Sequence, residues 1–91
     1  MTQDTENETL LEFPCEFSVK AMGLATDEFE TLVVDIVSHH VPDLHHSASK
    51  SRPSSNGKYL SVTVTFTAEN KAQLDAMYIE LSAHDSVIMA L

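Results

Sequence analysis

The alternation of apolar and polar side chains near the middle of the sequence constrains the fold more than any other feature. Its apolar members are Leu60, Val62, Val64 and Phe66, and its polar members are Ser61, Thr63, Thr65 and Thr67. A two-residue period is that of a β-strand with one buried and one solvated face. The polar row predicts a sheet face without helices, and the apolar row requires helices on the other face. We therefore expect a central strand over residues 58–67.

Three further segments are predicted to form strands. Residues 15–22 alternate in the same way, and Gly23 after them suits a tight exit from the strand with positive φ. Residues 44–52 are polar and alternate weakly, with a proline directly after them, as an edge strand tolerates. Residues 86–91 close the chain as a fourth strand, in which the last five side chains are apolar and uncharged.

Two segments have the apolar spacing of amphipathic helices. Asp27 and Glu30 form a pair like a capping box, after which apolar residues recur at helical spacing through residue 40. Thr67 is predicted to cap a second helix, whose apolar stripe runs through Ser82.

The predicted order of elements is βαββαβ, which is the ferredoxin-like arrangement within the α+β class. Right-handed crossovers give an antiparallel sheet of order 4-1-3-2, with both helices on one face of a two-layer sandwich. The open face of this sheet is expected to show Ser18, Lys20, Met22, Ser61, Thr63, Thr65, Ile88 and Ala90.

The 91 residues fit a single small domain. Residues 1–9 are polar and acidic without any strand or helix period, so we expect a disordered tail before a domain over 10–91. A single cysteine, Cys15, cannot form an intrachain disulfide. Because the sequence has neither a secretory signal nor an apolar run that could span a bilayer, we expect a cytoplasmic protein.

The formal net charge of −9 disfavours two classes of partner. Fourteen acidic residues against five basic ones repel a phosphate backbone and an anionic membrane, so neither nucleic acid nor a membrane is expected. Three of the five basic residues, Lys50, Arg52 and Lys58, bracket one turn. This hairpin is the basic spot of an acidic sequence.

Several separated motifs resemble those of a known family. They are Leu10-Leu11-Glu12-Phe13-Pro14, Phe17, Lys20, Met22-Gly23, the run from Pro53 to Val62, the run from Tyr78 to Leu81, and Val87, Met89 and Leu91. In order and spacing they resemble the YbeD-like family of small bacterial proteins. The resemblance implies a ferredoxin-like fold similar to regulatory ACT domains and a bacterial cytosolic protein, and it supplies no catalytic or binding residues.

Metal binding and catalysis have weak support in the residues. His39, His40, His45 and His46 surround Asp43, but their spacing matches no accepted zinc motif, and no metal or cofactor is predicted. Cys15 lies in an apolar alternation typical of an inert thiol, and a histidine beside an aspartate, as at residues 84–85, does not by itself make a catalytic pair. We expect no catalytic residues.

Two places are candidate binding sites. The first comprises the turn and its basic flanks, which suit a carboxylate or phosphate: Lys50, Arg52, Ser54, Ser55, Asn56, Gly57 and Lys58. The alternative is a solvated hairpin whose charges protect an edge strand. The second is the unprotected fourth strand, with Ile88, which invites a strand from a partner or from a second copy.

We therefore expect a regulatory or protein-interaction module without catalytic activity, which binds an unknown protein partner or itself through its fourth strand. A binder of a small amino-acid or anionic ligand, in the manner of ACT domains, is the alternative. A metal-dependent enzyme is the remote one.

Overall fold

A computed structural model describes residues 12–45 and 48–91 of the chain. The tail predicted over residues 1–9 lies outside the described residues. The elements follow in the order β1 (Cys15–Leu24), α2 (Phe29–His40), β2 (Ser49–Pro53), β3 (Tyr59–Ala68), α3 (Lys71–Ala83) and β4 (Met89–Ala90). This is the predicted βαββαβ order.

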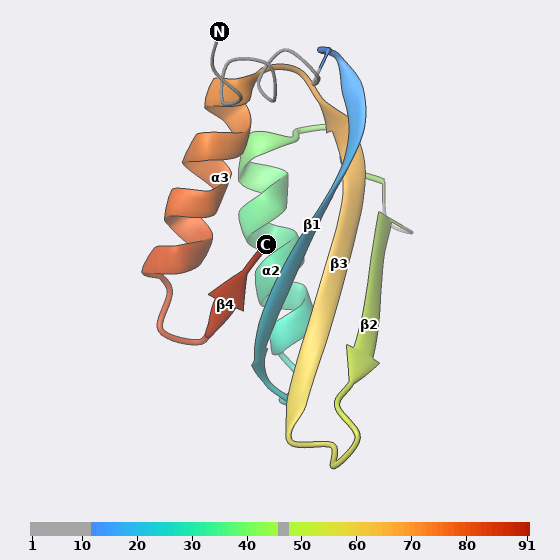
Figure 1. Ribbon diagram of the computed structural model, residues 1–91, viewed down its shortest axis with the longest axis vertical. Coiled ribbons are helices and arrows are strands. Elements are labelled where there is room, and N and C mark those ends of the chain that lie inside the picture. Colours follow the sequence, from blue (N-terminus) through green and yellow to red (C-terminus); the bar gives the residue numbers. More distant parts are fainter. Residues whose placement is uncertain (1–11, 46–47) are drawn as a thin grey trace, which may run out of the picture.

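The four strands form one sheet in the order β2-β3-β1-β4, with every neighbouring pair antiparallel. Read from the other edge, this is the predicted order 4-1-3-2. Both helices lie on the same side of the sheet, and no helix of the described residues covers the other side (Figure 1). The ferredoxin-like prediction is confirmed.

The core lies between the sheet and the helices because the apolar rows of the two central strands share one face. In the pairing of β1 with β3, Val19 lies opposite Val64 and Ala21 opposite Val62, and all four are fully buried. The helices supply the other half of the core, with Phe29, Val33, Ile36 and Val37 from α2 and Leu74, Met77 and Leu81 from α3. Burial of these facing rows is the main stabilising term of the domain.

Gly23 does not end the first strand, so that prediction is wrong. The strand continues through Leu24, and Gly57 is the glycine with positive φ among the described residues. A Cβ at Gly23 would lie 2.3 Å from the carbonyl oxygen of Ser86 and 2.5 Å from Cε1 of Phe29. The residue is glycine because the loop before β4 and an aromatic ring press against this part of the backbone.

Both predicted helix caps are wrong. Helix α2 begins after Glu28, whose side chain makes no capping hydrogen bond, and Glu30 instead accepts a hydrogen bond of 3.0 Å from the Ser49 hydroxyl. The cap of α3 is Asn70, whose side-chain oxygen accepts from the Gln73 N–H at 2.8 Å. Thr67 remains in β3 because the strand extends one residue further than predicted.

The edge strands are shorter than predicted. Strand β2 covers Ser49–Pro53 instead of residues 44–52, and β4 covers only Met89–Ala90. In β4 the faces also differ from the prediction. Met89 lies opposite Met22 on the open face, whereas Ala90 lies opposite Ala21 and packs against the core. The prediction that Ala90 lies on the open face is therefore wrong.

Candidate functional site

The register of the sheet places three basic residues in adjacent rows of its open face. Lys50 of β2 lies opposite Thr63 of β3, and Thr63 lies opposite Lys20 of β1. In the next row Arg52 lies opposite Ser61. Because side chains two residues apart on a strand share a face, Lys20, Lys50 and Arg52 project from the same side of the sheet.

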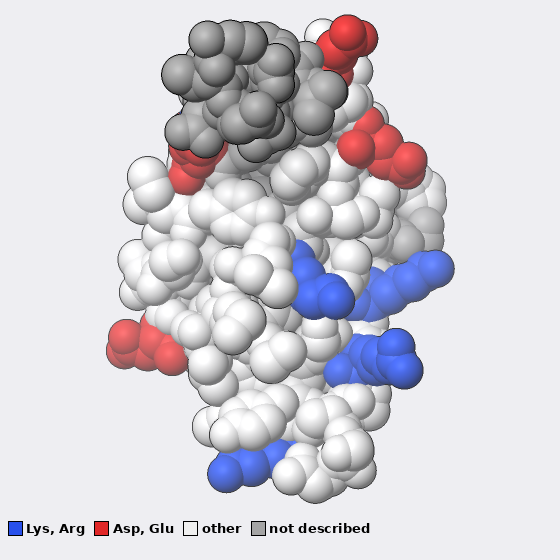
Figure 2. All heavy atoms as spheres, viewed as in Figure 1, with Lys and Arg blue, Asp and Glu red and all other residues white. Residues whose placement is uncertain are grey.

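These side chains border a shallow cleft of about 400 Å³ on the open face. It is lined by Lys20, Lys50, Ser51, Arg52, Ser61 and Thr63. Figure 2 shows the basic side chains gathered over this part of the molecule, with acidic side chains toward its margins. The cleft therefore combines cationic groups with the hydroxyls of Ser61 and Thr63, which suit the oxygen atoms of an anion. We call Lys20, Lys50 and Arg52 the basic cluster.

No ion pair joins the basic cluster to any carboxylate of the residues that the structure describes. By contrast, Nζ of Lys71 on α3 lies 3.0 Å from Oδ2 of Asp75, one helical turn further on. The contrast matters on a chain with 14 acidic residues, most of which lack a basic neighbour in the sequence.

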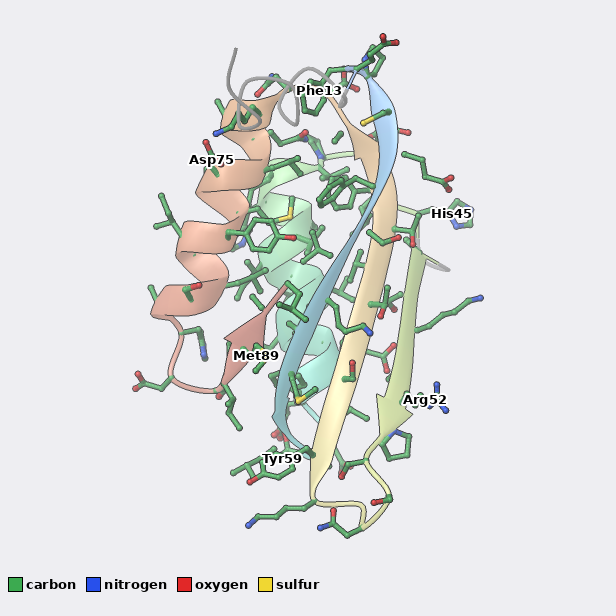
Figure 3. All side chains as sticks on the ribbon, viewed as in Figure 1. Phe13, His45, Arg52, Tyr59, Asp75 and Met89 are labelled. Atoms are coloured by element: carbon green, nitrogen blue, oxygen red, sulfur yellow. The ribbon has the colours of Figure 1, made fainter. Side chains whose placement is uncertain are left out.

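Exposed apolar side chains adjoin the basic cluster. Met22 lies opposite Ser61 in the row of Arg52, and Met89 extends the same row to the far edge. Met89 is 48% exposed, and Leu91, whose backbone exchanges two hydrogen bonds with Lys20, is 66% exposed. Figure 3 shows Arg52 and Met89 on opposite edge strands of the sheet. The open face thus grades from basic at β2 to apolar at β4.

Lys20 was assigned to the open face by its strand alternation, but the sequence does not show that it adjoins Lys50. The alternation within a strand fixes the face of each side chain and leaves open how far two strands are shifted along each other. The β1–β3 and β2–β3 registers supply that information. The one hint in the sequence that Lys20 adjoins Lys50 is the polar row of residues 61 and 63, because both flanking strands must pair with this row.

The turn between β2 and β3 uses its polar groups internally. The side-chain oxygen of Asn56 accepts from the Ser54 hydroxyl at 2.9 Å and from the Lys58 N–H at 3.0 Å. The Tyr59 N–H donates to the Ser54 hydroxyl oxygen at 3.1 Å, and Gly57 adopts a φ of 73°. These bonds form a self-contained turn, as expected for a tight hairpin.

The predicted members of the first site are only partly brought together. Lys50 and Arg52 enter the basic cluster, whereas Lys58 lies beyond the last paired residues of the hairpin, with its Nζ 5.4 Å from the centroid of the Tyr59 ring. Ser55 is exposed at the tip of the turn.

Ile88 lies beside a different depression. Its N–H donates to the carbonyl oxygen of Met22 at 2.7 Å, but its side chain, 58% exposed, lines a cavity that is also bordered by Phe29 and Leu32 of α2. The open-face position next to Met22, expected for Ile88, is occupied by Met89.

Two of the histidines join the helices. His40 Nε2 lies 2.8 Å and His39 Nδ1 lies 2.9 Å from the two carboxylate oxygens of Glu80 on α3. Hydrogen bonding to His40 and then to His39 lowers the pKa of Glu80 below its ordinary value of 4.5. Gln73 adds a bond of 2.7 Å to the carbonyl oxygen of His40. These contacts hold α2 against α3.

The other residues considered for metal binding or catalysis are Asp43, His46, Cys15 and His84. Within residues 12–45 and 48–91 no group of three histidine, cysteine or acidic side chains has the arrangement of a metal site, and His46 lies outside these ranges. Asp43 is exposed after α2, and Cys15 is half-buried against the core. His84 Nδ1 accepts from the Ser86 N–H at 3.1 Å, which orients its ring within the loop before β4.

Neither of the two described helices has the length and hydrophobicity that a bilayer-spanning segment requires.

Comparison with known proteins identifies the family. Residues 8–91 match the family described as "Protein of unknown function (DUF493)". A UPF0250 protein of Janthinobacterium sp. (strain Marseille) is 44% identical over 87 residues, covering 96% of each chain. A UPF0250 protein of Neisseria gonorrhoeae (strain NCCP11945) is 42% identical over 91 residues, covering 100% of each chain.

A solved structure supports the fold. The solution structure of protein HP0495 from H. pylori aligns with a TM-score of 0.70 at 16% identity, and the alignment covers 89% of this chain and 85% of that chain. The sequence matches and the fold together show that the chain belongs to the DUF493 (UPF0250) family of small bacterial proteins, the YbeD-like family that its motifs resemble.

Proposed function

We propose that the protein is a cytoplasmic interaction module without catalytic activity, and that its open sheet face binds an acidic segment of a partner protein. The observation that carries the proposal is the basic cluster of Lys20, Lys50 and Arg52, which is unpaired among the described residues of a chain with a net charge of −9. Regulation of the partner is the role that such binding would serve.

Electrostatics selects the partner's chemistry. The acidic surface elsewhere on the chain repels acidic segments, so that an acidic partner is attracted only where the cations gather. Exposed charge pairs contribute little affinity individually, about 0.2–1 kcal/mol each. The apolar contacts of Met89 and Leu91 must therefore supply part of the binding free energy. The partner segment should join an apolar strand to a neighbouring acidic stretch, because the side chains of a strictly alternating strand would point to opposite faces of the sheet.

The β4 edge gives such a segment a place to align. The strand carries no charged side chain and no proline, which are the usual protections of an edge. A partner strand added beside β4 extends the sheet and places its apolar side chains next to Met89 and Leu91, and an acidic stretch that follows this strand can cross the open face to the basic cluster. A second copy of the chain is the other candidate for this edge, and it must overcome repulsion between two acidic molecules.

The test is a titration of the ¹⁵N-labelled protein with a capped peptide that joins an apolar stretch to an acidic one, acetyl-Leu-Val-Leu-Gly-Asp-Glu-Asp-amide. We expect amide shifts in β1, β2 and β4, and an affinity that falls several-fold as salt is raised from about 20 to about 200 mM. The variant Lys20→Ala/Arg52→Ala should weaken binding by about threefold to tenfold.

A matched control separates the cluster from net charge. The control variant Lys58→Ala/Lys71→Ala also removes two positive charges, one from the turn and one from α3. It should bind the peptide as the wild type does. Equal losses in the two double variants would show that binding follows net charge alone and would contradict the proposal.

The cleft itself favours a second candidate function, the binding of a small anionic or amino-acid ligand. The hydroxyls of Ser61 and Thr63, together with the basic cluster, border a volume of about 400 Å³, which is within the range of small-molecule sites. A rise in melting temperature with inorganic phosphate or a free dicarboxylate, abolished by Lys50→Ala and absent with the peptide, would favour this function over the first.

A further inference from the structure

We propose a second docking site on this protein, a groove that binds a segment of a partner in which a large apolar side chain stands next to lysine or arginine. The groove lies where the end of β1, the start of α2 and the loop before β4 meet, and its volume is about 470 Å³. The apolar part of its lining is formed by Leu24, Phe29, Leu32 and Ile88. It shares no lining residue with the basic cluster, so the inference is independent of the proposed function.

The groove adjoins the close approach at Gly23. The missing side chain lets the Phe29 ring and the Ser86 carbonyl lie directly against the β1 backbone. The ring is 2% exposed and forms part of the floor, while the loop of Asp85 and Ser86 forms one wall. Such a fixed floor suits a preformed site, because little ordering of the protein is required on binding.

The apolar lining calls for an apolar group in the occupant. Leu24 is 53% exposed and Ile88 is 58% exposed, although both adjoin the buried Phe29. Apolar side chains that are exposed together around a hollow mark binding sites more often than isolated ones do. A single large side chain of a partner, inserted between them, would remove apolar surface from water on both molecules.

The acidic groups of the lining determine the second requirement. Glu28 and Asp85 are both exposed, and neither forms an ion pair with any residue that the structure describes. No lysine or arginine lines the groove. The remaining titratable side chain of the lining, His84, uses Nδ1 to accept a hydrogen bond from the Ser86 N–H, so it organises the wall. Two unpaired carboxylates beside an apolar hollow attract a cation that is attached to an apolar group and repel an acidic segment.

The experiment is a titration of the ¹⁵N-labelled protein with two matched peptides, acetyl-Gly-Phe-Lys-Gly-amide and acetyl-Gly-Phe-Glu-Gly-amide. We expect the lysine peptide to shift the amides of Leu24, Thr26, Ser86 and Ile88, and the glutamate peptide to leave them in place. The variant Glu28→Gln/Asp85→Asn should weaken binding of the lysine peptide by about fivefold.

The control variant Asp35→Asn/Asp43→Asn makes the same change of net charge on exposed residues outside the groove, and it should bind the lysine peptide as the wild type does. Three results would each overturn the proposal. They are the absence of shifts at the groove, equal binding of the two peptides, and equal loss of affinity in the two double variants. Phenethylammonium ion binding as tightly as the lysine peptide would overturn the partner segment as occupant and assign the groove to small amines.

Discussion

At the scale of single residues, Gly23 shows how one missing side chain shapes both the core and the surface. A Cβ there would meet a backbone oxygen and an aromatic ring at distances well below van der Waals contact. Neither neighbour can yield easily, because the Ser86 oxygen belongs to the backbone and the Phe29 ring is held in the core. The glycine therefore sets the distance between β1, α2 and the loop before β4.

The first prediction is that Gly23→Ala destabilises the domain by about 1–3 kcal/mol, through overpacking. Denaturation in urea measures the change. Gly57→Ala provides the comparison, since its Cβ would meet nothing within 4 Å while its φ of 73° disfavours alanine. It should cost about 1 kcal/mol by backbone strain alone. If Gly23→Ala unfolds at the same urea concentration as the wild type, the backbone at this position is not packed as closely as described.

The second prediction concerns the pH dependence of the contact between α2 and α3. Hydrogen bonds from His40 and His39 lower the pKa of Glu80 below 4.5. A carboxyl group with a lowered folded-state pKa stabilises the fold above its unfolded pKa, and this contribution is lost as pH falls through the folded-state value. The melting temperature of the wild type should therefore fall faster than that of Glu80→Gln below pH 4.5.

At higher pH the wild type should be the more stable of the two, by a small margin because Glu80 is exposed to solvent screening. Asp43→Asn, which removes an exposed carboxylate elsewhere, should leave the pH dependence of the melting temperature unchanged. Parallel curves for the wild type and Glu80→Gln would show that the two histidines do not stabilise the ionised carboxylate.

At the scale of elements, the two faces of β3 differ in what they contribute. Val64 lies opposite Val19 on the face that the helices cover, and it is fully buried. Its neighbour Thr63 points to the open face between Lys20 and Lys50. The third prediction is that Val64→Ala costs about 1–3 kcal/mol of unfolding free energy and Thr63→Ala much less. Equal costs in urea denaturation would mean that the sheet is oriented the other way.

The elements also show what a sequence can and cannot predict. The order of strands followed from the alternation of apolar residues and the handedness of crossovers, because both are local or general rules. The length and face of β4 did not follow, since Val87 to Leu91 are apolar in every position and an uninterrupted apolar run carries no alternation. The predicted cap of α2 failed because Glu30 bonds to Ser49, a residue of another element, and that of α3 failed because β3 extends through Ala68.

For a related reason, only two of the three residues of the basic cluster were predicted to lie together. Lys50 and Arg52 are close in sequence and were found together, whereas Lys20 joins them only through two strand registers. The groove at Gly23 was not predicted at all. Its lining comes from β1, α2 and the loop before β4, and no pattern within one segment indicates that these three meet.

At the scale of the whole molecule, charge is segregated between surfaces. The chain carries −9 overall, yet its open sheet face presents the basic cluster, and the groove presents unpaired carboxylates. Opposite charges on two surfaces allow opposite partners, and each surface excludes the other's ligand by repulsion. The same segregation makes salt a means of distinguishing partner binding from self-association.

The last prediction is that self-association through β4 strengthens as the salt concentration is raised, whereas binding of the acidic peptide weakens. Two copies that pair at the uncharged β4 edge bury Met89 and Leu91 and bring two net charges of −9 together, so screening lowers the repulsion between them. Light scattering at about 100 μM protein should give the monomer mass of 10.0 kDa at low salt and a larger mean mass at about 0.5 M salt. Met89→Lys, which places a charge on this edge, should remain at 10.0 kDa in both conditions, and Ile79→Lys, at an exposed position of α3 that is not part of the edge, should behave as the wild type does. A mean mass that is largest at low salt would instead mean that the acidic surface of one copy binds the basic cluster of another, and the β4 edge would then not be the site of self-association.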